Sequence, residues 1–326
     1  MAEVAKARRT WALLLSPEDA ADAAARAVVR HHLRAFTESE ERARAGEVEP
    51  IHQLRVATRR LRATLRLFEP VLPVRLAGPG LAELAWLGSV IGPVRDADVL
   101  SEAVLGRAQR LGPELRSLLG PLGIALHERR MAAHEALILA LDSSRCRRLL
   151  DRLAGYAVSP AASRRGAVRL GDIAPDLLRP LLRSVLRSGR RLSADSSPPA
   201  FHRLRVRVKR LRYAVETLGG LGGKSMRKLL RQLVRLQDLL GEHQDAVTIA
   251  ARLRALAEEA GLPRPTVLAT GALVLDFVRR ARKLRRRFPE AWQRLDRRRL
   301  RDGVAAELRA SASRRVAPPR LRATGT

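Results

Sequence analysis

The sequence predicts an all-α protein built from two pseudo-symmetric four-helix bundles, with a central basic groove between them. Long segments rich in Ala, Leu and Arg repeat apolar residues at helical spacing, and no segment alternates apolar and polar residues between turns. One basic amphipathic stretch occurs twice, 150 positions apart, and a second motif recurs in the same order, 149 positions apart. Two repeated motifs at nearly one offset indicate an internal duplication, whose units each hold about four substantial helices.

The first unit is expected to span residues 17–157, after an N-terminal segment of residues 1–16. Ser16 and Pro17 are typical of a helix start, and prolines open and close the next helix. Gly92 and Pro93 should kink or split the third helix. The helices expected in this unit cover residues 16–46, 50–70, 81–110, 113–141 and 144–157.

The second unit is expected to span residues 173–302 and to follow a linker of residues 158–172, which is rich in small and polar residues. A glycine-rich turn, Gly219 to Gly223, precedes its longest helix. The helices expected here cover residues 175–192, 202–218, 224–260, 266–288 and 289–301. Residues 303–326 are basic and contain proline, so we expect a disordered tail.

The basic stretch from His52 to Phe68 carries five arginines and no acid. At 3.6 residues per turn its basic side chains form one stripe, and its leucines form another face. The copy from His202 to Leu218 keeps this pattern, with Lys209 at the position of Arg59. One face of each helix should therefore be buried, and the other should meet a negative partner.

The chain carries 63 Lys and Arg against 33 Asp and Glu, for a net charge of +30. It is also 46% hydrophobic, enough for packed cores, so it is not a basic disordered tail. Such a charge implies a polyanionic partner: nucleic acid, an acidic membrane or inorganic polyphosphate. Arginine outnumbers lysine because the guanidinium suits phosphate oxygens, or equally because of a GC-rich genome.

A single cysteine, Cys146, excludes an internal disulfide and a multi-cysteine zinc site. No apolar run reaches the length of a transmembrane helix; the nearest, residues 267–278, contains Asp276. We therefore expect a cytoplasmic protein without membrane insertion.

The stretches HQLRVATRRLRATLRLF and HRLRVRVKRLRYAVETL resemble the conserved histidine α-helical domain, known as CHAD. The repeated Gly-x-x-x-Asp segments and the ending FPEAW add to this resemblance, which covers about residues 17–301. It implies two helical bundles facing each other across a basic channel, binding of inorganic polyphosphate, and association with polyphosphate granules. Some members are fused to a triphosphate tunnel domain; the roughly 16 residues before the first helix leave no room for one, so we expect a stand-alone form.

Basic residues along a helix recur about every 5.4 Å, so a stripe can follow a chain of phosphates with many charge-assisted contacts. Basic residues of other helices should complete the groove. We expect Arg26 and Arg30 of the first half to correspond to Arg183 and Arg187 of the second, and Arg130 and His134 to correspond approximately to Arg280 and Lys283. The candidate polyphosphate site comprises His52, Arg55, Arg59, Arg62, Arg66, His202, Arg205, Lys209, Arg212, Arg26, Arg30, Arg130, His134, Arg183, Arg187, Arg280 and Lys283.

Other roles for the histidines and acids remain open. His52 and His202 are expected to donate to phosphate; the alternatives are metal ligation, with His127 and His134 as conceivable partners, and capping of the helix start. A cation site amid so much positive charge is disfavoured, so we expect no metal and no cofactor. We expect Asp96, Asp98 and Asp245 to orient arginines rather than to act in catalysis.

Two other function classes compete with polyphosphate binding. A non-specific nucleic-acid-binding protein would explain the charge, but aromatic residues, on which single-strand binders stack bases, make up only 3% of the chain. A hydrolase or kinase acting on polyphosphate would need an acidic Mg²⁺ site. We therefore expect a binding protein rather than an enzyme, with an oligomeric state that the sequence leaves open.

Overall fold

The structure is a computed structural model that describes residues 15–110, 112–159, 167–259 and 261–313. These residues form helices and turns, with one isolated β-bridge and no strand among them, which confirms the all-α prediction. No helix within these ranges is both long and apolar enough to span a lipid bilayer. The first half consists of α2 (Ala21–Arg44), α3 (Val48–Leu67), η1 (Glu69–Val71), α4 (Val74–Ala108), α5 (Pro113–Ser117), α6 (Gly120–Asp142) and α7 (Ser144–Val158). The second half consists of α8 (Leu170–Gly189), α9 (Pro198–Leu218), η2 (Gly219–Leu221), α10 (Lys224–Glu259), α11 (Arg264–Arg286), α12 (Phe288–Leu295) and α13 (Arg298–Ser313).

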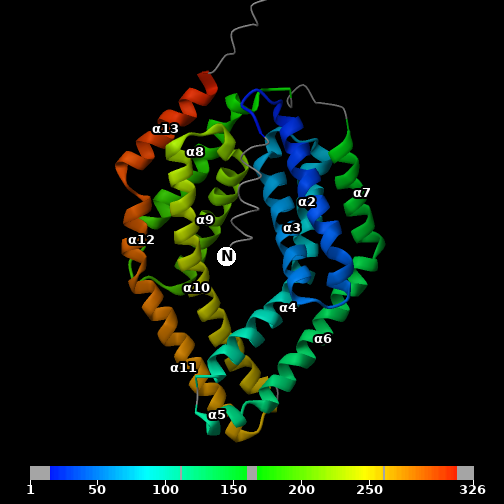
Figure 1. Ribbon diagram of the computed structural model, residues 1–326, viewed down its shortest axis with the longest axis vertical. Helices are drawn as coiled ribbons and strands as arrows, with labels where there is room; N and C mark the ends of the chain where they lie inside the picture. The colour runs from blue at the N-terminus through cyan, green and yellow to red at the C-terminus, as the bar shows by residue number, and fades with distance from the viewer. Residues whose placement is uncertain (1–14, 111, 160–166, 260, 314–326) are drawn as a thin grey trace, which may run out of the picture.

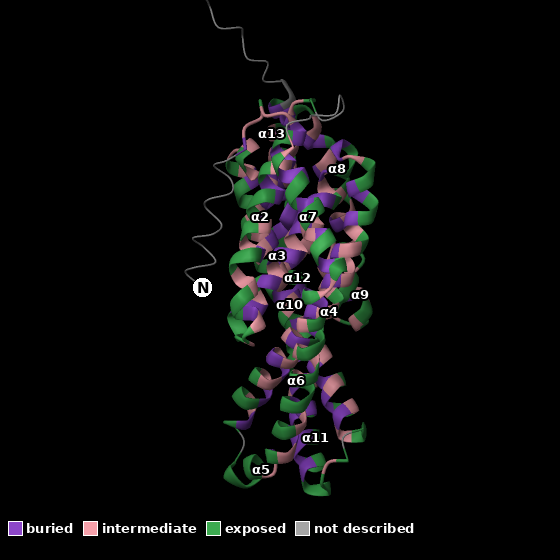
Figure 2. Ribbon diagram, turned by 90° about the vertical axis from the view of Figure 1, so that its right-hand side faces the viewer, coloured by how far each residue is buried: buried purple, intermediate pink, exposed green. Residues whose placement is uncertain are grey.

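The helices form two groups that meet along α3 and α9 (Figure 1). In the first group α2 packs on α3 and α7, and α3 packs on α4; in the second, α8 and α10 both pack on α9 and α13. The two longest helices, α4 and α10, continue beyond these groups into a narrower distal end with α5, α6 and α11 (Figure 1). Figure 2 shows buried residues along both the wide body and the distal end.

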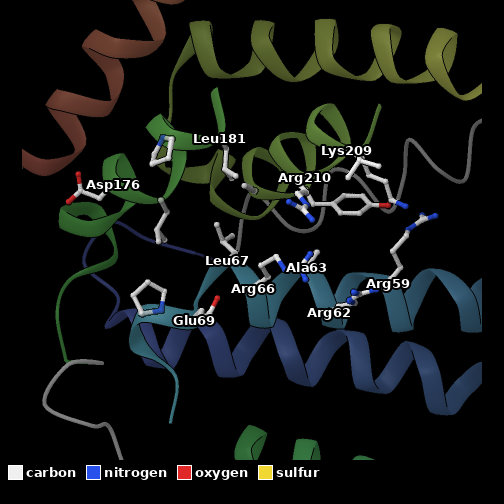
Figure 3. A pocket seen from close by; sticks show the side chains of 16 residues that line it. Arg59, Arg62, Ala63, Arg66, Leu67, Glu69, Asp176, Leu181, Lys209 and Arg210 are labelled. Carbon is white, nitrogen blue, oxygen red and sulfur yellow. The ribbon is translucent and has the colours of Figure 1, made fainter. Parts of the chain in front are cut away.

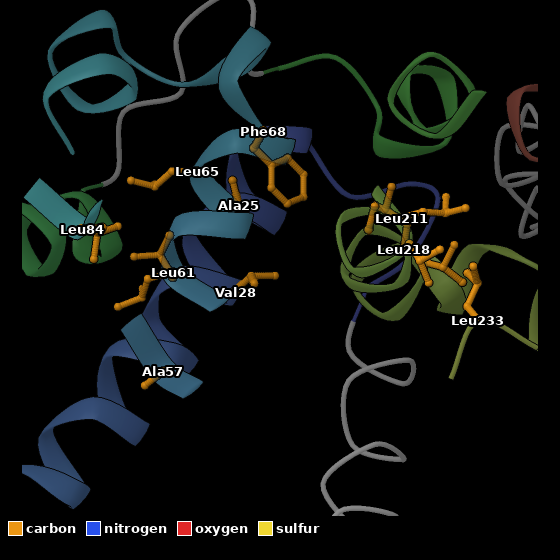
Figure 4. Packing of buried hydrophobic residues seen from close by; sticks show 14 of the residues in the cluster. Ala25, Val28, Ala57, Leu61, Leu65, Phe68, Leu84, Leu211, Leu218 and Leu233 are labelled. Carbon is orange, nitrogen blue, oxygen red and sulfur yellow. The ribbon is translucent and has the colours of Figure 1, made fainter. Parts of the chain in front are cut away.

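The hydrophobic core does not divide at the boundary between the halves. One cluster runs from Leu61 and Leu65 of α3 to Leu211 of α9 and Leu233 of α10, parts of which Figure 4 shows. A second cluster fills the distal end with residues of α4 and α6 from the first half and of α10 and α11 from the second. Both halves therefore contribute to each of the two cores.

Many helix boundaries lie within a few residues of the expectations, and differences occur in both halves: α5 and α6 divide the helix expected at 113–141, and α12 and α13 divide the one expected at 289–301. Gly92 and Pro93 do not split α4, which is assigned as one helix across them. The helix α8 begins at Leu170, inside the expected linker. Residues 160–166 of that linker lie outside the described residues.

The expected disordered tail is wrong over residues 303–313, which complete α13. Leu300, Val304 and Leu308 recur every four residues and are almost fully buried, so they dock this helix against α8 and α10. The carboxylate of Glu307 accepts backbone N–H groups at the start of α10, including that of Ser225 at 2.7 Å. It thus satisfies donors that have no partner within their own helix. The remaining tail residues lie outside the described part of the chain.

Candidate functional site

The two copies of the basic motif lie on α3 and α9, which contact each other at the boundary between the halves. Ile51, Leu54 and Leu61 of α3 are fully buried because helical spacing gathers them on one face. The helix α9 buries its apolar face in the same way. The basic side chains are left to face the other half, so that Arg59 of α3 and Lys209 of α9 point toward one another (Figure 3).

A cavity of about 520 Å³ lies where α3, α8 and α9 meet (Figure 3), and we call it the central cavity. Five basic side chains and two acidic ones line it, so its charge is net positive. Basic residues of both motif copies and apolar residues of α8 form its walls. The lining residues are Arg59, Arg62, Ala63, Arg66, Leu67, Glu69, Pro70, Asp176, Leu177, Pro180, Leu181, Val206, Lys209, Arg210, Tyr213 and Ala214.

Lys209 is the most perturbed basic group in the central cavity. Its partial burial, followed by the guanidinium of Arg59 and then that of Arg205, lowers its pKa to about 6. Both causes penalise the charged ammonium, because burial removes water and the arginines repel it. At neutral pH the side chain is therefore mostly neutral while the cavity is empty.

Several hydrogen-bond donors at the cavity are buried without an acceptor. They include Nε of Arg59, Nε of Arg62 and the hydroxyl of Tyr213, none of which has a hydrogen-bond partner among the described residues. Burial is also the main cause of the lowered pKa of Arg59 and of Arg62. Buried donors without partners are costly, so the site is suited to a ligand that brings acceptor oxygens.

A buried acid at the boundary neutralises part of this charge. Glu216 of α9 is 9% exposed; its carboxylate lies 3.2 Å from Nη1 of Arg60 on α3 and 3.6 Å from Nε of Arg212. The guanidiniums of Arg60 and Arg212 each lie 5.2 Å from the centre of the Tyr213 ring. We expected Arg212 to line the groove; instead it is buried in this cluster and does not line the central cavity.

Asp96 of α4 joins the two halves away from the central cavity. It accepts a hydrogen bond from Nη2 of Arg252 on α10 at 2.7 Å, and its other oxygen lies 3.3 Å from Nη2 of Arg55 on α3. A Cβ atom at Gly92 would come within 2.9 Å of Nη1 of Arg55, so the glycine gives this guanidinium room. The expected orienting role is confirmed for Asp96, whereas Asp245 is exposed and has no ion pair within the described ranges.

Arg130 and His134 of α6 hold the end of α2 rather than the central cavity. Nε of Arg130 donates to Asp98 at 2.7 Å, which confirms the orienting role of that acid, and Nη2 donates to the carbonyl of Gly46 at 2.6 Å. Nε2 of His134 lies 3.0 Å from the carbonyl of Ala43. His134 thus contacts a carbonyl in the last turn of α2, and Arg130 holds the turn that follows it.

Arg26 and Arg30 of α2 were also expected at the groove, but they turn toward α7. Nη1 of Arg26 pairs with Asp22 at 2.6 Å, and Nη2 of Arg30 donates to the carbonyl of Ala157 at 2.6 Å. Neither lines the central cavity.

The remaining candidates of the second half lie apart from the central cavity in two places. Arg280 of α11 pairs with Glu242 at 2.8 Å, and Lys283 is exposed on the same helix. Arg183 and Arg187 of α8 line a separate cavity beside the central one.

His52 and His202 lie in the second turns of α3 and α9, so the helix-capping alternative is wrong. Burial, followed by the nearby guanidinium of Arg95, lowers the pKa of His52. Nδ1 of His202 lies 2.9 Å from Oε1 of Gln244 on α10. Neither histidine lines the central cavity, and no three His, Cys, Asp or Glu side chains converge as metal ligands in the part of the chain that the structure describes.

Sequence reasoning missed several lining residues of the central cavity. Arg210 matches Arg60 in the other copy of the motif, which was a usable signal, but both lie one position beyond the stripe. Tyr213 lies one position beyond Arg212 of the stripe, and its type gave no sign of a buried hydroxyl at the cavity. The apolar residues of α8 that line the cavity could not be recognised from the sequence, because apolar residues at helical spacing are equally typical of a buried core face.

Comparisons with known proteins agree with this architecture. PptA from Streptomyces chartreusis matches with a TM-score of 0.70 at 22% identity, over 84% of this chain and 100% of that one, which shows a shared fold. The crystal structure of the CHAD domain from the plant Ricinus communis matches with a TM-score of 0.68 at 27% identity, over 92% of this chain and 95% of that one.

Sequence comparisons add two relatives and a family model. Two uncharacterized proteins, from two strains of Mycobacterium tuberculosis, are each 28% identical over 78% of this chain and 49% of their own length. The chain thus spans about half the length of the curated relatives that it matches. The family model for the CHAD domain matches residues 27–254, from α2 to α10 and through both motif helices. The chain therefore belongs to the CHAD domain family.

Proposed function

We propose that the protein binds inorganic polyphosphate in the central cavity, without chemical turnover of the chain. The observation that carries the proposal is that basic side chains of α3 and α9 meet at the central cavity, where Nε of Arg59, Nε of Arg62 and the hydroxyl of Tyr213 are buried without a partner among the described residues. Linear polyphosphate supplies closely spaced anionic oxygens, and it carries no base or sugar for which the cavity would need room. Membership of the CHAD family supports this ligand class, and association with polyphosphate granules belongs to the same proposal.

The chemistry of the central cavity favours a bare phosphate chain over nucleic acid. Guanidinium groups match phosphate oxygens through paired N–H donors, whereas nucleic-acid readers add exposed rings for stacking. Tyr213 is the one aromatic residue among those that line the cavity, and it is only 6% exposed beneath arginine side chains. Its ring is therefore not available to a base, while its hydroxyl can donate to a phosphate oxygen.

Competition binding tests the choice of ligand. Long-chain polyphosphate, single-stranded RNA and duplex DNA would each be titrated into the full chain over a salt series. We expect polyphosphate to bind tightest at equal phosphate concentration, and its affinity to fall steeply with salt because binding releases counterions. Displacement of polyphosphate by RNA at equal phosphate concentration would contradict the proposal and favour the nucleic-acid alternative.

Phosphate release with and without Mg²⁺ tests the absence of turnover. Incubation of long-chain polyphosphate with the protein should leave the chain-length distribution unchanged on a gel. Shortened chains or free phosphate above the level of a heat-inactivated sample would instead indicate an enzyme.

A further inference from the structure

A second basic cavity lies beside the central one, between α8 and α9, and we call it the α8–α9 basin. It has a volume of about 670 Å³, and five arginines but no carboxylate line it. A third cavity, on α10 and α12, balances three arginines with three acids, so the excess of positive charge in the basin is not shared by every cavity. The arginines of the basin are Arg183, Arg187, Arg191, Arg203 and Arg207.

The basin arginines have no carboxylate partner among the described residues. Arg207 donates to the hydroxyl of Ser188 at 3.2 Å, and the other four make no ion pair within the described ranges. Five like charges around one hollow repel each other, so an anion that enters relieves the repulsion and gains charge-assisted hydrogen bonds.

The basin continues the central cavity along one helix. Pro180 lines both cavities, with Asp176 on the central side and Arg187 on the basin side. From Asp176 to Arg187 the helix α8 rises about 16 Å, so the two cavities form a track several phosphates long. On the facing helix α9, Arg203, Arg207 and Arg210 recur at helical spacing along the same track.

The first half offers no equivalent extension. Arg26 and Arg30, which we had matched with Arg183 and Arg187, are engaged by Asp22 and by the carbonyl of Ala157. Arg60, the motif counterpart of Arg210, is held by Glu216 at 3.2 Å. Arginines without a carboxylate partner therefore continue from the central cavity along α8 and α9, whereas Arg26, Arg30 and Arg60 of the first half are engaged.

We propose that the α8–α9 basin is an extension subsite that receives the continuation of a linear phosphate chain leaving the central cavity. The proposal rests on the proposed function and adds selection by chain length to it. A chain that fills only the central cavity gains nothing from the basin, whereas a longer chain contacts both. Because the extension lies on one side, the bound chain leaves the cavity over the second half of the molecule.

Binding of two phosphate lengths to matched variants tests the subsite. The basin variant carries Arg183→Gln, Arg187→Gln and Arg203→Gln; the control carries Arg279→Gln, Arg282→Gln and Arg286→Gln, which remove the same charge from the exposed face of α11. Tripolyphosphate and size-fractionated long-chain polyphosphate are the probes, and thermal unfolding checks that both variants fold.

We expect the basin variant to lose about tenfold or more in affinity for the long chain and less than about twofold for tripolyphosphate. The slope of its long-chain affinity against salt should fall by roughly two, because three cationic contacts are gone. An equal loss for both lengths, no loss for the long chain, or the same losses in the control variant would overturn the subsite. Failure of the unmodified protein to bind either phosphate would instead contradict the proposed function itself.

Discussion

Polyphosphate binding should be coupled to the uptake of a proton by Lys209. In the empty cavity burial and the neighbouring arginines hold the pKa of this side chain at about 6. A phosphate chain placed against it reverses the electrostatic cause, because an opposite charge close by favours the ammonium. Binding therefore raises the pKa of Lys209, and at neutral pH each complex takes up close to one proton.

The sign and size of the pH dependence follow from that pKa. Below pH 6 Lys209 is already charged in the free protein, so affinity is full; above pH 6 each complex must first protonate it, so affinity falls as pH rises. The loss is at most about tenfold per pH unit, which between about pH 5.5 and 7.5 amounts to roughly 25-fold, or about 2 kcal/mol. Long chains keep the titrating terminal phosphates a small fraction of the ligand.

Isothermal titration calorimetry in buffers of different ionisation enthalpy measures the proton uptake directly. The unmodified protein should take up close to one proton at about pH 7.5, and much less at about pH 5. Lys209→Gln, which carries no charge at any pH, should bind weakly and lose most of this dependence. His52→Gln serves as the control, because the pKa of His52 is also lowered and could contribute. Proton uptake that persists in Lys209→Gln, or an affinity independent of pH in the unmodified protein, would refute the reasoning.

Two further predictions concern an ion pair that joins the halves and the space around two helix glycines. Glu216→Gln removes the acid that pairs with Arg60 and should lower the free energy of unfolding by about 3 kcal/mol, because it leaves buried positive charge uncompensated. Urea unfolding measures this loss. A midpoint within error of that of the unmodified protein would show that the pair does not stabilise the fold. Gly241→Ala meets no atom within 4 Å and should stabilise its helix by about 0.5–1 kcal/mol, as alanine does over glycine. Gly92→Ala should lose most of that gain, because its Cβ would come within 2.9 Å of Nη1 of Arg55; equal urea midpoints for the two variants would contradict this account of Gly92.

Much of the fold could be predicted from local pattern. Helix existence and many boundaries followed from apolar spacing and from prolines at helix starts, as at Pro289 in the first turn of α12. The failure at α13 has a simple cause: basic composition hid the apolar spacing of Val304 and Leu308, whose burial depends on a partner surface formed by α8 and α10.

The sharing of cores between the halves could not be predicted in the same way. Periodicity identifies which face of a helix is buried and says nothing about which helix covers it. Leu253 of α10 and Leu122 of α6 both have an ordinary buried face in the sequence, yet they belong to one distal cluster contributed by the two halves. Only the assembled chain brings these faces together.

The motif repeat predicted part of the lining of the central cavity. The duplicated stretch pointed to Arg59, Arg62 and Lys209, which line it, since a stripe that is basic twice at matching positions suggests two facing walls. A single arginine outside a repeat is ambiguous: Arg30 and Arg130 satisfy backbone carbonyls at helix ends. Such partners are distant in sequence, so spacing alone cannot separate a ligand contact from a structural one.

The most direct test of the central claim compares the central cavity with an equally charged surface. The cavity variant carries Arg59→Gln, Arg62→Gln and Lys209→Gln, and the control carries three glutamines on α11 at Arg279, Arg282 and Arg286. Titration with long-chain polyphosphate at physiological salt should show a loss of about 100-fold or more for the cavity variant, since three charge-assisted contacts disappear. The control should stay within about threefold of the unmodified protein, as screened exposed charges allow. Equal losses in the two variants would mean that net charge, and not the cavity between α3 and α9, binds the chain.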